Sequence, residues 1–379
     1  MQGQTRRCPA CPRERYITVQ EEGRVLNRPG FCVSILSMWL IIATTATGES
    51  GRASSQETTS TWRHVQPVGF DTPMPIRLVG PDEPWEKVVQ DVQKHISSKA
   101  SGQGVHVGFY GHGAFVKPEE LLKHDLPFVA ALGLVARMDV MIFPQLPFPE
   151  KNPLQDIPQD ILQMPLIDLF KNPLEVIEIA RNKAHQLASE SRYGTAHATV
   201  RLTAGISAFH RQRMTPSLAA FSNSALVIVK MGQLLEHGMI SDSYKTIPVA
   251  REVRQSLYVK NVVTFGYPLP YGHVSTALSH RISGAFTNVV PERFWKQLWG
   301  NFPLQGAVEN VSVPWAPSHN EWPRLHPKGP EVAALGAFLG RGRTRGAMPK
   351  HAVISPDALR AHGAAFGLGK LAVGIHHGQ

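Results

Sequence analysis

The chain has 379 residues, of which 42% are hydrophobic, and this is enough apolar sequence for a substantial buried core. Its formal net charge is +10, but the basic residues are spread out, with the densest groups near the two ends, so the charge does not indicate a nucleic-acid groove. The sequence has no aromatic–basic alternation, no zinc-ligand spacing and no phosphate-binding glycine loop. We therefore expect no nucleic-acid partner, no metal and no cofactor.

The first 48 residues have the pattern of a secretory signal. Six arginines precede an uncharged apolar run at residues 30–48, which ends in small residues, with Ala46 as the expected last residue before cleavage. An uncleaved anchor and a buried core helix are the alternatives, and the arginines argue against the helix. Cys8, Cys11 and Cys32 all lie in this segment, so a cleaved product has no cysteine chemistry. Residues 49–75, with a region rich in Ser and Thr, are predicted to form a flexible linker.

The next residues predict a βαβ unit. Apolar residues at helical spacing indicate a helix over residues 84–98, and a short apolar strand at 105–110 leads into Gly111, His112 and Gly113. A second helix begins at Pro118, and residues 139–143 form a continuous buried strand. This order predicts a single α/β domain over residues 76–340, whose mainly parallel sheet has helices on both faces.

A proline-rich excursion follows from Pro144 to Pro173, which is too irregular for core elements and too apolar for a plain linker. Residues 174–191 are predicted to form a helix. Residues 199–209 read Thr-Val-Arg-Leu-Thr-Ala-Gly-Ile-Ser-Ala-Phe, a β-favouring run that enters Gly205-x-Ser207. We interpret it as a third strand at 199–204 that ends in a strand-to-helix turn carrying Ser207. The alternative is an ordinary buried strand that ends in a loop without chemistry.

Further along the chain, residues 216–235 are apolar with small residues and are predicted to continue as a helix. Another buried strand is predicted in the run that starts at Val259, and residues 262–268 of this run read Val-Val-Thr-Phe-Gly-Tyr-Pro. Residues 285–291 read Ala-Phe-Thr-Asn-Val-Val-Pro, and a late strand at 311–313 leads into a loop that contains His319. A last helix is expected at residues 331–339. The remainder, 341–379, is a basic tail rich in Gly, Ala and His.

These motifs resemble the lipase-type α/β-hydrolases over roughly residues 104–340. The resemblance implies a serine nucleophile at Ser207, a base at His319, and an acid at position 288, where this chain has Asn288 in place of aspartate. It also implies an oxyanion hole at the loop Gly111, His112 and Gly113, with the N–H of Ala208 as a further donor. Phe209 is a second departure, because the family has a small residue there.

Three positions offer alternatives for the missing or ambiguous roles. Glu309 and Glu321 are the substitute acids, since an amide cannot stabilise an imidazolium as a carboxylate does. His326 is a rival of His319 for the base, and either histidine is otherwise a surface-loop residue. In this family the catalytic order along the chain is serine, acid, histidine, and Ser207, position 288 and His319 respect it.

The sequence thus predicts a secreted or membrane-associated serine hydrolase of carboxylic esters. Its partners would be an ester or lipid substrate and a membrane surface. Asn288 and Phe209 favour a second interpretation, in which the same fold has lost its activity and serves as a binding or scaffolding module. A third is a membrane-anchored structural protein.

Overall fold

A computed structural model of the chain describes residues 61–97, 105–114, 118–148, 194–241, 246–268, 272–291, 301–313, 319–342 and 352–353. The signal-like segment 1–48, the predicted helix at 174–191, most of the proline-rich excursion and most of the tail lie outside the described residues. Among the described helices, none is long and apolar enough to cross a membrane.

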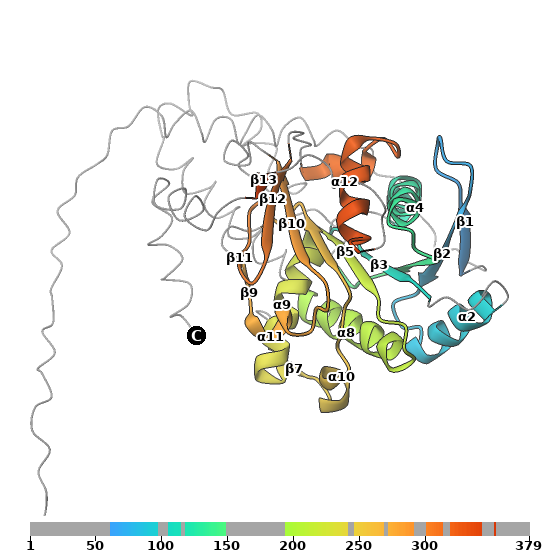
Figure 1. Cartoon of the computed structure of the whole chain (residues 1–379). Coiled ribbons are helices and arrows are strands. Elements are labelled where there is room, and N and C mark those ends of the chain that lie inside the picture. Colours follow the sequence, from blue (N-terminus) through green and yellow to red (C-terminus); the bar gives the residue numbers. More distant parts are fainter. Residues whose placement is uncertain are drawn as a thin grey trace, which may run out of the picture. The chain divides into compact units, whose positions relative to one another are not determined.

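The described residues form an α/β fold built on one mixed, mostly parallel sheet (Figure 1). Its nine strands have the order β1-β2-β4-β3-β5-β8-β10-β12-β13, and only the pairs β1–β2 and β12–β13 at the two edges are antiparallel. The strands are β1 Trp62–Val65, β2 Met74–Val79, β3 Val107–Gly111, β4 Val140–Pro144, β5 Ser217–Phe221, β8 Val262–Phe265, β10 Phe286–Pro291, β12 Glu309–Val313 and β13 Ala352–Val353. The α/β class and the parallel pairing of β3 with β4 confirm the prediction.

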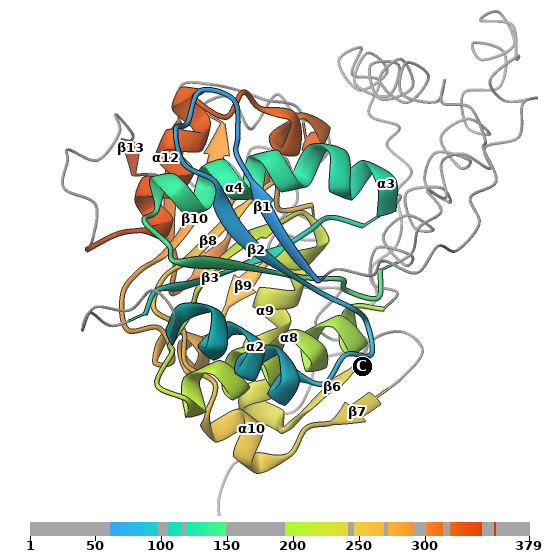
Figure 2. The same ribbon diagram turned by 90° about the vertical axis from the view of Figure 1, so that its right-hand side faces the viewer.

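Helices cover both faces of this sheet (Figures 1 and 2). One face carries α2 Trp85–Ser97, α8 Thr195–Arg211 and α9 Asn223–His237, and the other carries α4 Leu126–Val135 and α12 Pro330–Leu339. Strands β2 to β5 and β8 are buried on both faces and therefore read as nearly continuous apolar runs, as expected for a covered parallel sheet. The predicted helices over 84–98 and 331–339 are confirmed.

Short elements complete the described fold. The helix that begins at Pro118 runs through α3 Pro118–Glu120 and a π-helical turn η1 Leu121–Asp125 into α4. The remaining elements are the pairs β6 Met239–Ser241 with β7 Thr246–Pro248 and β9 His273–Val274 with β11 Gln305–Gly306, and the helices α10 Arg251–Gln255, α11 Thr276–Ser279 and η4 His319–Arg324.

The prediction of a strand and turn at residues 199–209 is wrong, because the whole stretch lies inside α8. Its buried residues Ala198, Leu202 and Ile206 recur every four positions and form one helical face in the core. The hydroxyl of Thr199 donates a 2.6 Å hydrogen bond to the carbonyl of Thr195, one turn back, so this β-branched residue is satisfied in a helix. The periodicity of the buried residues outweighed the local β propensity.

Gly205 has a packing role in this helix. A Cβ added to Gly205 would lie 2.5 Å from the indole ring of Trp85, so only glycine lets α8 approach α2 this closely. The glycine that suggested a tight turn is therefore a helix–helix contact.

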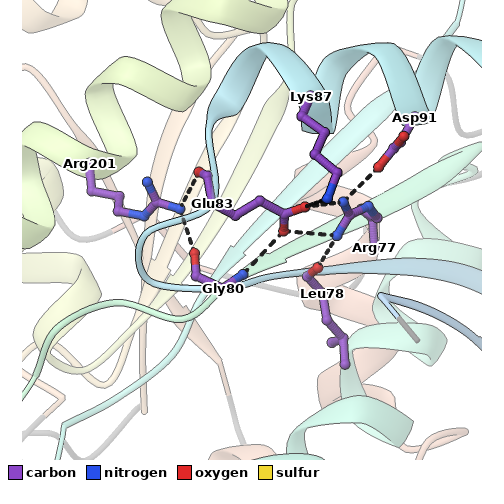
Figure 3. A network of polar contacts seen from close by, with 7 residues as sticks. All are labelled: Arg77, Leu78, Gly80, Glu83, Lys87, Asp91 and Arg201. Atoms are coloured by element: carbon purple, nitrogen blue, oxygen red, sulfur yellow. Dashed lines mark hydrogen bonds and ion pairs between the residues drawn. The ribbon is translucent and has the colours of Figure 1, made fainter. Parts of the chain in front are cut away.

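A buried polar network joins α8 to the sheet and to α2 (Figure 3). The fully buried guanidinium of Arg77 on β2 pairs with Glu83 at 2.6 Å and with Asp91 at 2.7 Å. Arg201 of α8 donates to the carbonyl oxygens of Gly80 and Glu83 in the turn between β2 and α2. The network anchors α8 against the turn that begins α2.

Two boundaries also differ from the prediction. Strand β1 and the first residues of β2 lie inside the range 49–75 that was expected to be a linker, because β1 pairs with β2 and extends the sheet. The range 216–235 was expected to be helical throughout, but it divides into strand β5 and helix α9.

The described ends of the chain on either side of residues 149–193 meet at one place. A Cβ added to Gly194, whose φ is +73°, would overlap the carbonyl oxygen of Pro147. The chain therefore leaves the sheet after β4 and returns to α8 through adjacent points.

Candidate active site

The sheet has a topological switch point between β3 and β5. From β3 the chain passes through α4 on one face to β4, whereas from β5 it passes through α9 on the opposite face to β8. At such a point the loops after the two strands separate, and a crevice forms outside their carboxyl ends. Here the 111–114 loop, which begins at the last residue of β3, and Ser222, which follows β5, lie at these carboxyl ends.

Ser222 stands on a sharp strand-to-helix turn. It follows the last residue of β5 and precedes the first residue of α9, and its backbone has φ 53° and ψ −119°. A positive φ is unusual for a residue with a Cβ and is found at functional sites where surrounding structure maintains it. Two backbone hydrogen bonds maintain this conformation here. The Ser222 N–H donates to the carbonyl of Phe265 at 3.2 Å, and the Ser222 carbonyl accepts from the N–H of Ala225 at 2.9 Å.

The turn is closely packed on both sides, which explains the small residues around the serine. Ala220 and Ser224, two positions before and after Ser222, are both fully buried. A Cβ added to Gly111 would lie 2.5 Å from the Cβ of Ser224, and one added to Gly113 would lie 3.3 Å from the Cβ of Ser222. The predicted loop of Gly111, His112 and Gly113 therefore lies against this turn rather than against Ser207.

His112 is a buried, neutral residue that orders the loop. Its Nε2 accepts a 3.0 Å hydrogen bond from the Leu146 N–H, so its Nδ1 carries the proton and donates to the Gly113 carbonyl at 2.7 Å. Burial lowers the pKa of His112 to about 4, against the smaller raising effect of the Gly113 contact. With both ring nitrogens engaged by the backbone, His112 supports the loop and is not placed to act as a base.

Ser207 and Ala208 do not belong to this site. Ser207 is a fully buried residue of α8, and its hydroxyl donates a 2.7 Å hydrogen bond to the carbonyl of Val253. Ala208 is buried within the same helix, where the backbone N–H groups are used by the helix itself. The assignment of Ser207 as nucleophile and of Ala208 as oxyanion donor was therefore wrong.

Asn288 has a structural role inside the sheet. It lies in the middle of β10, in register with Thr264 of β8 and Asn310 of β12. Its amide oxygen accepts from Thr264 at 2.8 Å, and its amide nitrogen donates to Asn310 at 2.9 Å and to the carbonyl of Phe302 at 3.2 Å. These contacts engage both amide hydrogens and join three strands to the 301–304 segment.

Glu309 is not placed to replace the missing acid. It is the first residue of β12, which runs parallel to β10, and β10, β8 and β5 are also parallel. Glu309 therefore lies at the amino edge of the sheet, opposite to Ser222, and pairs with Arg341 at 2.8 Å. The prediction that Glu309 serves the active site is wrong for this reason.

The other predicted residues follow the carboxyl end of β12, on the same edge as Ser222. His319 begins η4, but its side chain lies outside the described residues, and Glu321 is an exposed residue of the same turn. His326 is exposed, and its Nδ1 accepts from the Lys328 N–H at 3.3 Å. The roles of His319, Glu321 and His326 stay predictions.

Asp125 is the one buried carboxylic acid in the part of the chain that the structure describes. It ends the π-helical turn η1, which contacts η4, and it accepts a 3.2 Å hydrogen bond from the hydroxyl of Tyr110. Burial raises its pKa to about 7, despite opposing effects of Tyr110 and Arg324. No sequence pattern indicates this buried acid, because a lone Asp in a helix is usually exposed.

The sequence around Ser222 carries a signal for the strand-to-helix turn. Residues 220–224 read Ala-Phe-Ser-Asn-Ser, with small residues at both positions that the turn requires, whereas Ser207 has Phe209 on one side. Within the described residues, no three histidine, cysteine, aspartate or glutamate side chains are grouped as a metal site.

Comparisons of the chain with protein-family models, with curated proteins and with solved structures found no match. The candidate site therefore depends on its own geometry.

Proposed function

We propose that the protein is a serine hydrolase of the α/β-hydrolase type that acts on carboxylic esters, with Ser222 as its nucleophile. The observation that carries the proposal is the strained turn at Ser222, with φ 53°, placed between a central parallel strand and a helix at the switch point of the sheet. Such a turn places the serine hydroxyl beside the first N–H groups of the following helix. Ser222 itself is only 6% exposed. The motifs at residues 262–268 and 285–291 resemble the lipase-type enzymes and support the same class.

The surrounding groups fit the requirements of acyl transfer. Ser222 would attack the ester carbonyl, and the N–H of Asn223 would donate to the developing oxyanion together with an N–H of the 111–114 loop. His319 is the proposed base, since it follows β12 in the chain. With Glu321 as the acid the order along the chain is serine, histidine, acid, which departs from the order of the lipase-type enzymes. Glu321 is the predicted acid on the Ser222 edge of the sheet. No metal or cofactor takes part in the proposed reaction.

The proposed substrate is an ester or lipid met at a membrane surface outside the cytoplasm. This part of the proposal depends on the signal-like order of arginines, apolar run and small residues in the first 48 residues. An acidic or nucleic-acid partner is not proposed.

The contacts of Asn288 favour one competing function, a binding or scaffolding module with the same fold. Its amide is engaged within the sheet at the position where the resemblance implies the acid. A domain without an acid would lose about four orders of magnitude in turnover if it followed the serine-protease precedent.

The test compares the purified wild type with Ser222→Ala and Ser207→Ala. We expect hydrolysis of a short-chain aryl ester and labelling by a fluorophosphonate in the wild type and in Ser207→Ala, and neither in Ser222→Ala. Loss of labelling in Ser207→Ala alone would contradict the assignment of Ser222. A wild type that neither labels nor hydrolyses any of a series of esters would favour the binding module.

A further inference from the structure

The 111–114 loop has little space for side chains, which favours glycine, and it must also hold its backbone N–H groups in fixed directions. Gly113 has to be glycine-like in size, because a Cβ there would lie 3.0 Å from the ring of Phe221 and 3.3 Å from the Cβ of Ser222. Glycine, however, also allows the adjoining peptide groups to rotate into conformations that other residues avoid. Some other contact must therefore determine which way the loop's N–H groups face.

Two side chains supply those contacts, one for each peptide group. The hydroxyl of Ser224 donates a 2.6 Å hydrogen bond to the carbonyl of His112, and the imidazole of His112 donates to the carbonyl of Gly113 at 2.7 Å. In a trans peptide the N–H is opposite to the carbonyl oxygen, so holding the two carbonyls also orients the N–H groups of Gly113 and Ala114. A reversed peptide would present an oxygen where an oxyanion donor is required.

We propose that Ser224 is a positioning residue of the Ser222 site, which keeps the His112–Gly113 peptide in the orientation that stabilises the oxyanion. This inference rests on the proposed serine hydrolase function. Ser224 is suited to the role because it lies in the first turn of α9, two residues after Ser222, and is fully buried. The nucleophile and the orientation of its oxyanion loop are thereby controlled from one helical turn.

The close contact between Ser224 and the loop supports this role. A Cβ added to Gly111 would lie 2.5 Å from the Cβ of Ser224 and 2.6 Å from its hydroxyl oxygen. The side chain thus fills the space that the absence of a Cβ at Gly111 leaves open. Ser224 thus packs against the backbone of Gly111 and donates a hydrogen bond to the carbonyl of the next residue, His112.

The experiment compares Ser224→Ala with Ser207→Ala, a matched control. Both serines are fully buried, and each donates one short hydrogen bond to a backbone carbonyl, but Ser207 lies in α8 away from Ser222. Turnover of a short-chain aryl ester is measured per active site, with sites counted by fluorophosphonate titration, so that a partly unfolded sample still gives a value.

We expect Ser224→Ala to lower kcat at least ~10-fold with little change in KM, because a misoriented donor weakens the transition state more than the ground state. Removal of a whole oxyanion donor costs about 10²–10³-fold and sets the upper limit. Ser207→Ala should keep the wild-type kcat. A crystal structure of Ser224→Ala should show the His112 carbonyl in a new or mixed orientation.

Equal kcat values for the two variants, in an active wild type, would overturn the role of Ser224 and leave the proposed function intact. An inert wild type would overturn both. If Ser224→Ala does not fold, Ser224→Cys replaces it, because a thiol is a weaker donor of similar shape, and the same loss of kcat is expected.

Discussion

The stretches around Ser207 and Ser222 show how a short serine motif can take two opposite structures. Each has a small residue two positions before the serine, yet the first is the interior of a 17-residue helix and the second is a turn with φ 53°. The two stretches differ in the burial pattern of the residues that flank the serine. Around Ser207 the buried residues repeat with helical period, whereas Ser222 follows five consecutive buried residues of a central strand. A sharp strand-to-helix turn at a serine is thus better recognised by small residues on both sides of the serine than by a glycine on one side.

The stretch around Ser207 is held in place by the polar network that anchors α8. The prediction with the largest expected effect on stability tests this network. Arg77→Leu removes the buried cation from Glu83 and Asp91, and breaking a buried pair in this way costs about 3–5 kcal/mol. Urea unfolding measures the loss. Lys87→Ala is the control: Lys87 contacts the same Glu83 at 3.3 Å but is 62% exposed, so a loss below ~1 kcal/mol is expected. Equal losses would show that the network adds nothing beyond surface charge.

The two stretches also differ in the titratable groups around them. The loop beside Ser222 contains His112, and the strand before this loop contacts Asp125 through Tyr110. The Ser207–Val253 contact contains no titratable group. Folding lowers the pKa of His112 to about 4, so His112 favours folding above pH 6.5, and that stability is lost as the pH falls toward 4. Folding raises the pKa of Asp125 to about 7, so its contribution is present below pH 3.8 and is lost as the pH rises through 7. Between these limits the two trends oppose each other.

Asp125→Asn should therefore expose the trend of His112. Its free energy of unfolding should fall by roughly 1.4 kcal/mol per pH unit as the pH is lowered from 6.5 to 4, while the wild type changes less over the same range. Urea unfolding at several pH values gives both slopes. Parallel slopes in the two proteins would contradict the opposed pKa shifts.

Two glycines allow the stretches to be separated by activity. Gly111→Ala would place a Cβ 2.5 Å from that of Ser224, and Gly205→Ala would place one 2.5 Å from the indole of Trp85. Overpacking of this kind costs about 1–3 kcal/mol in each case. If the proposed function is correct, only Gly111→Ala should also lower kcat per labelled site, by more than ~10-fold, because it displaces the loop proposed to supply an oxyanion donor. A similar loss of kcat in Gly205→Ala would place α8 in the site after all.

The smallest effect tests the helical state of α8 itself. His197 is exposed near its start, so its substitutions report mainly intrinsic propensity. His197→Ala should stabilise the protein by about 0.5 kcal/mol, and His197→Gly should be about 1 kcal/mol less stable than the alanine variant. Thermal unfolding gives the order. If His197→Ala were less stable than the wild type, the result would instead favour the strand predicted at residues 199–204.

The sequence predicted the parts of the fold whose pattern does not depend on distant neighbours. Helices α2 and α12 and strands β3, β4 and β8 appear where periodicity or continuous apolar runs placed them. The error at α8 arose from Thr199 and Val200, whose β propensity is weaker than the gain from packing a helical face on the sheet. Strand β5, Ser-Leu-Ala-Ala-Phe, has the opposite composition and was taken for helix.

The candidate site was predicted only in part, because it also depends on neighbours that are distant in the sequence. The loop of Gly111, His112 and Gly113 was implied by the resemblance to the lipase-type enzymes, because it follows an early strand. Ser222 was missed because its strand has little β propensity, and Glu309 was misplaced because the edge of a sheet on which a residue lies depends on the direction of every strand between. The buried state of Asp125 depends on Tyr110 and α4 and leaves no local trace.

The contact between Gly194 and Pro147 has a consequence for how this gene can change. Because the chain leaves and rejoins the described fold at neighbouring points, β4 and α8 place no demand on the length of the sequence between residues 148 and 194. Each doubling of the length of a flexible connection costs only about 0.6 kcal/mol in closure entropy. The sequence between these two points can therefore be shortened, lengthened or exchanged without a change in the positions of β4 and α8.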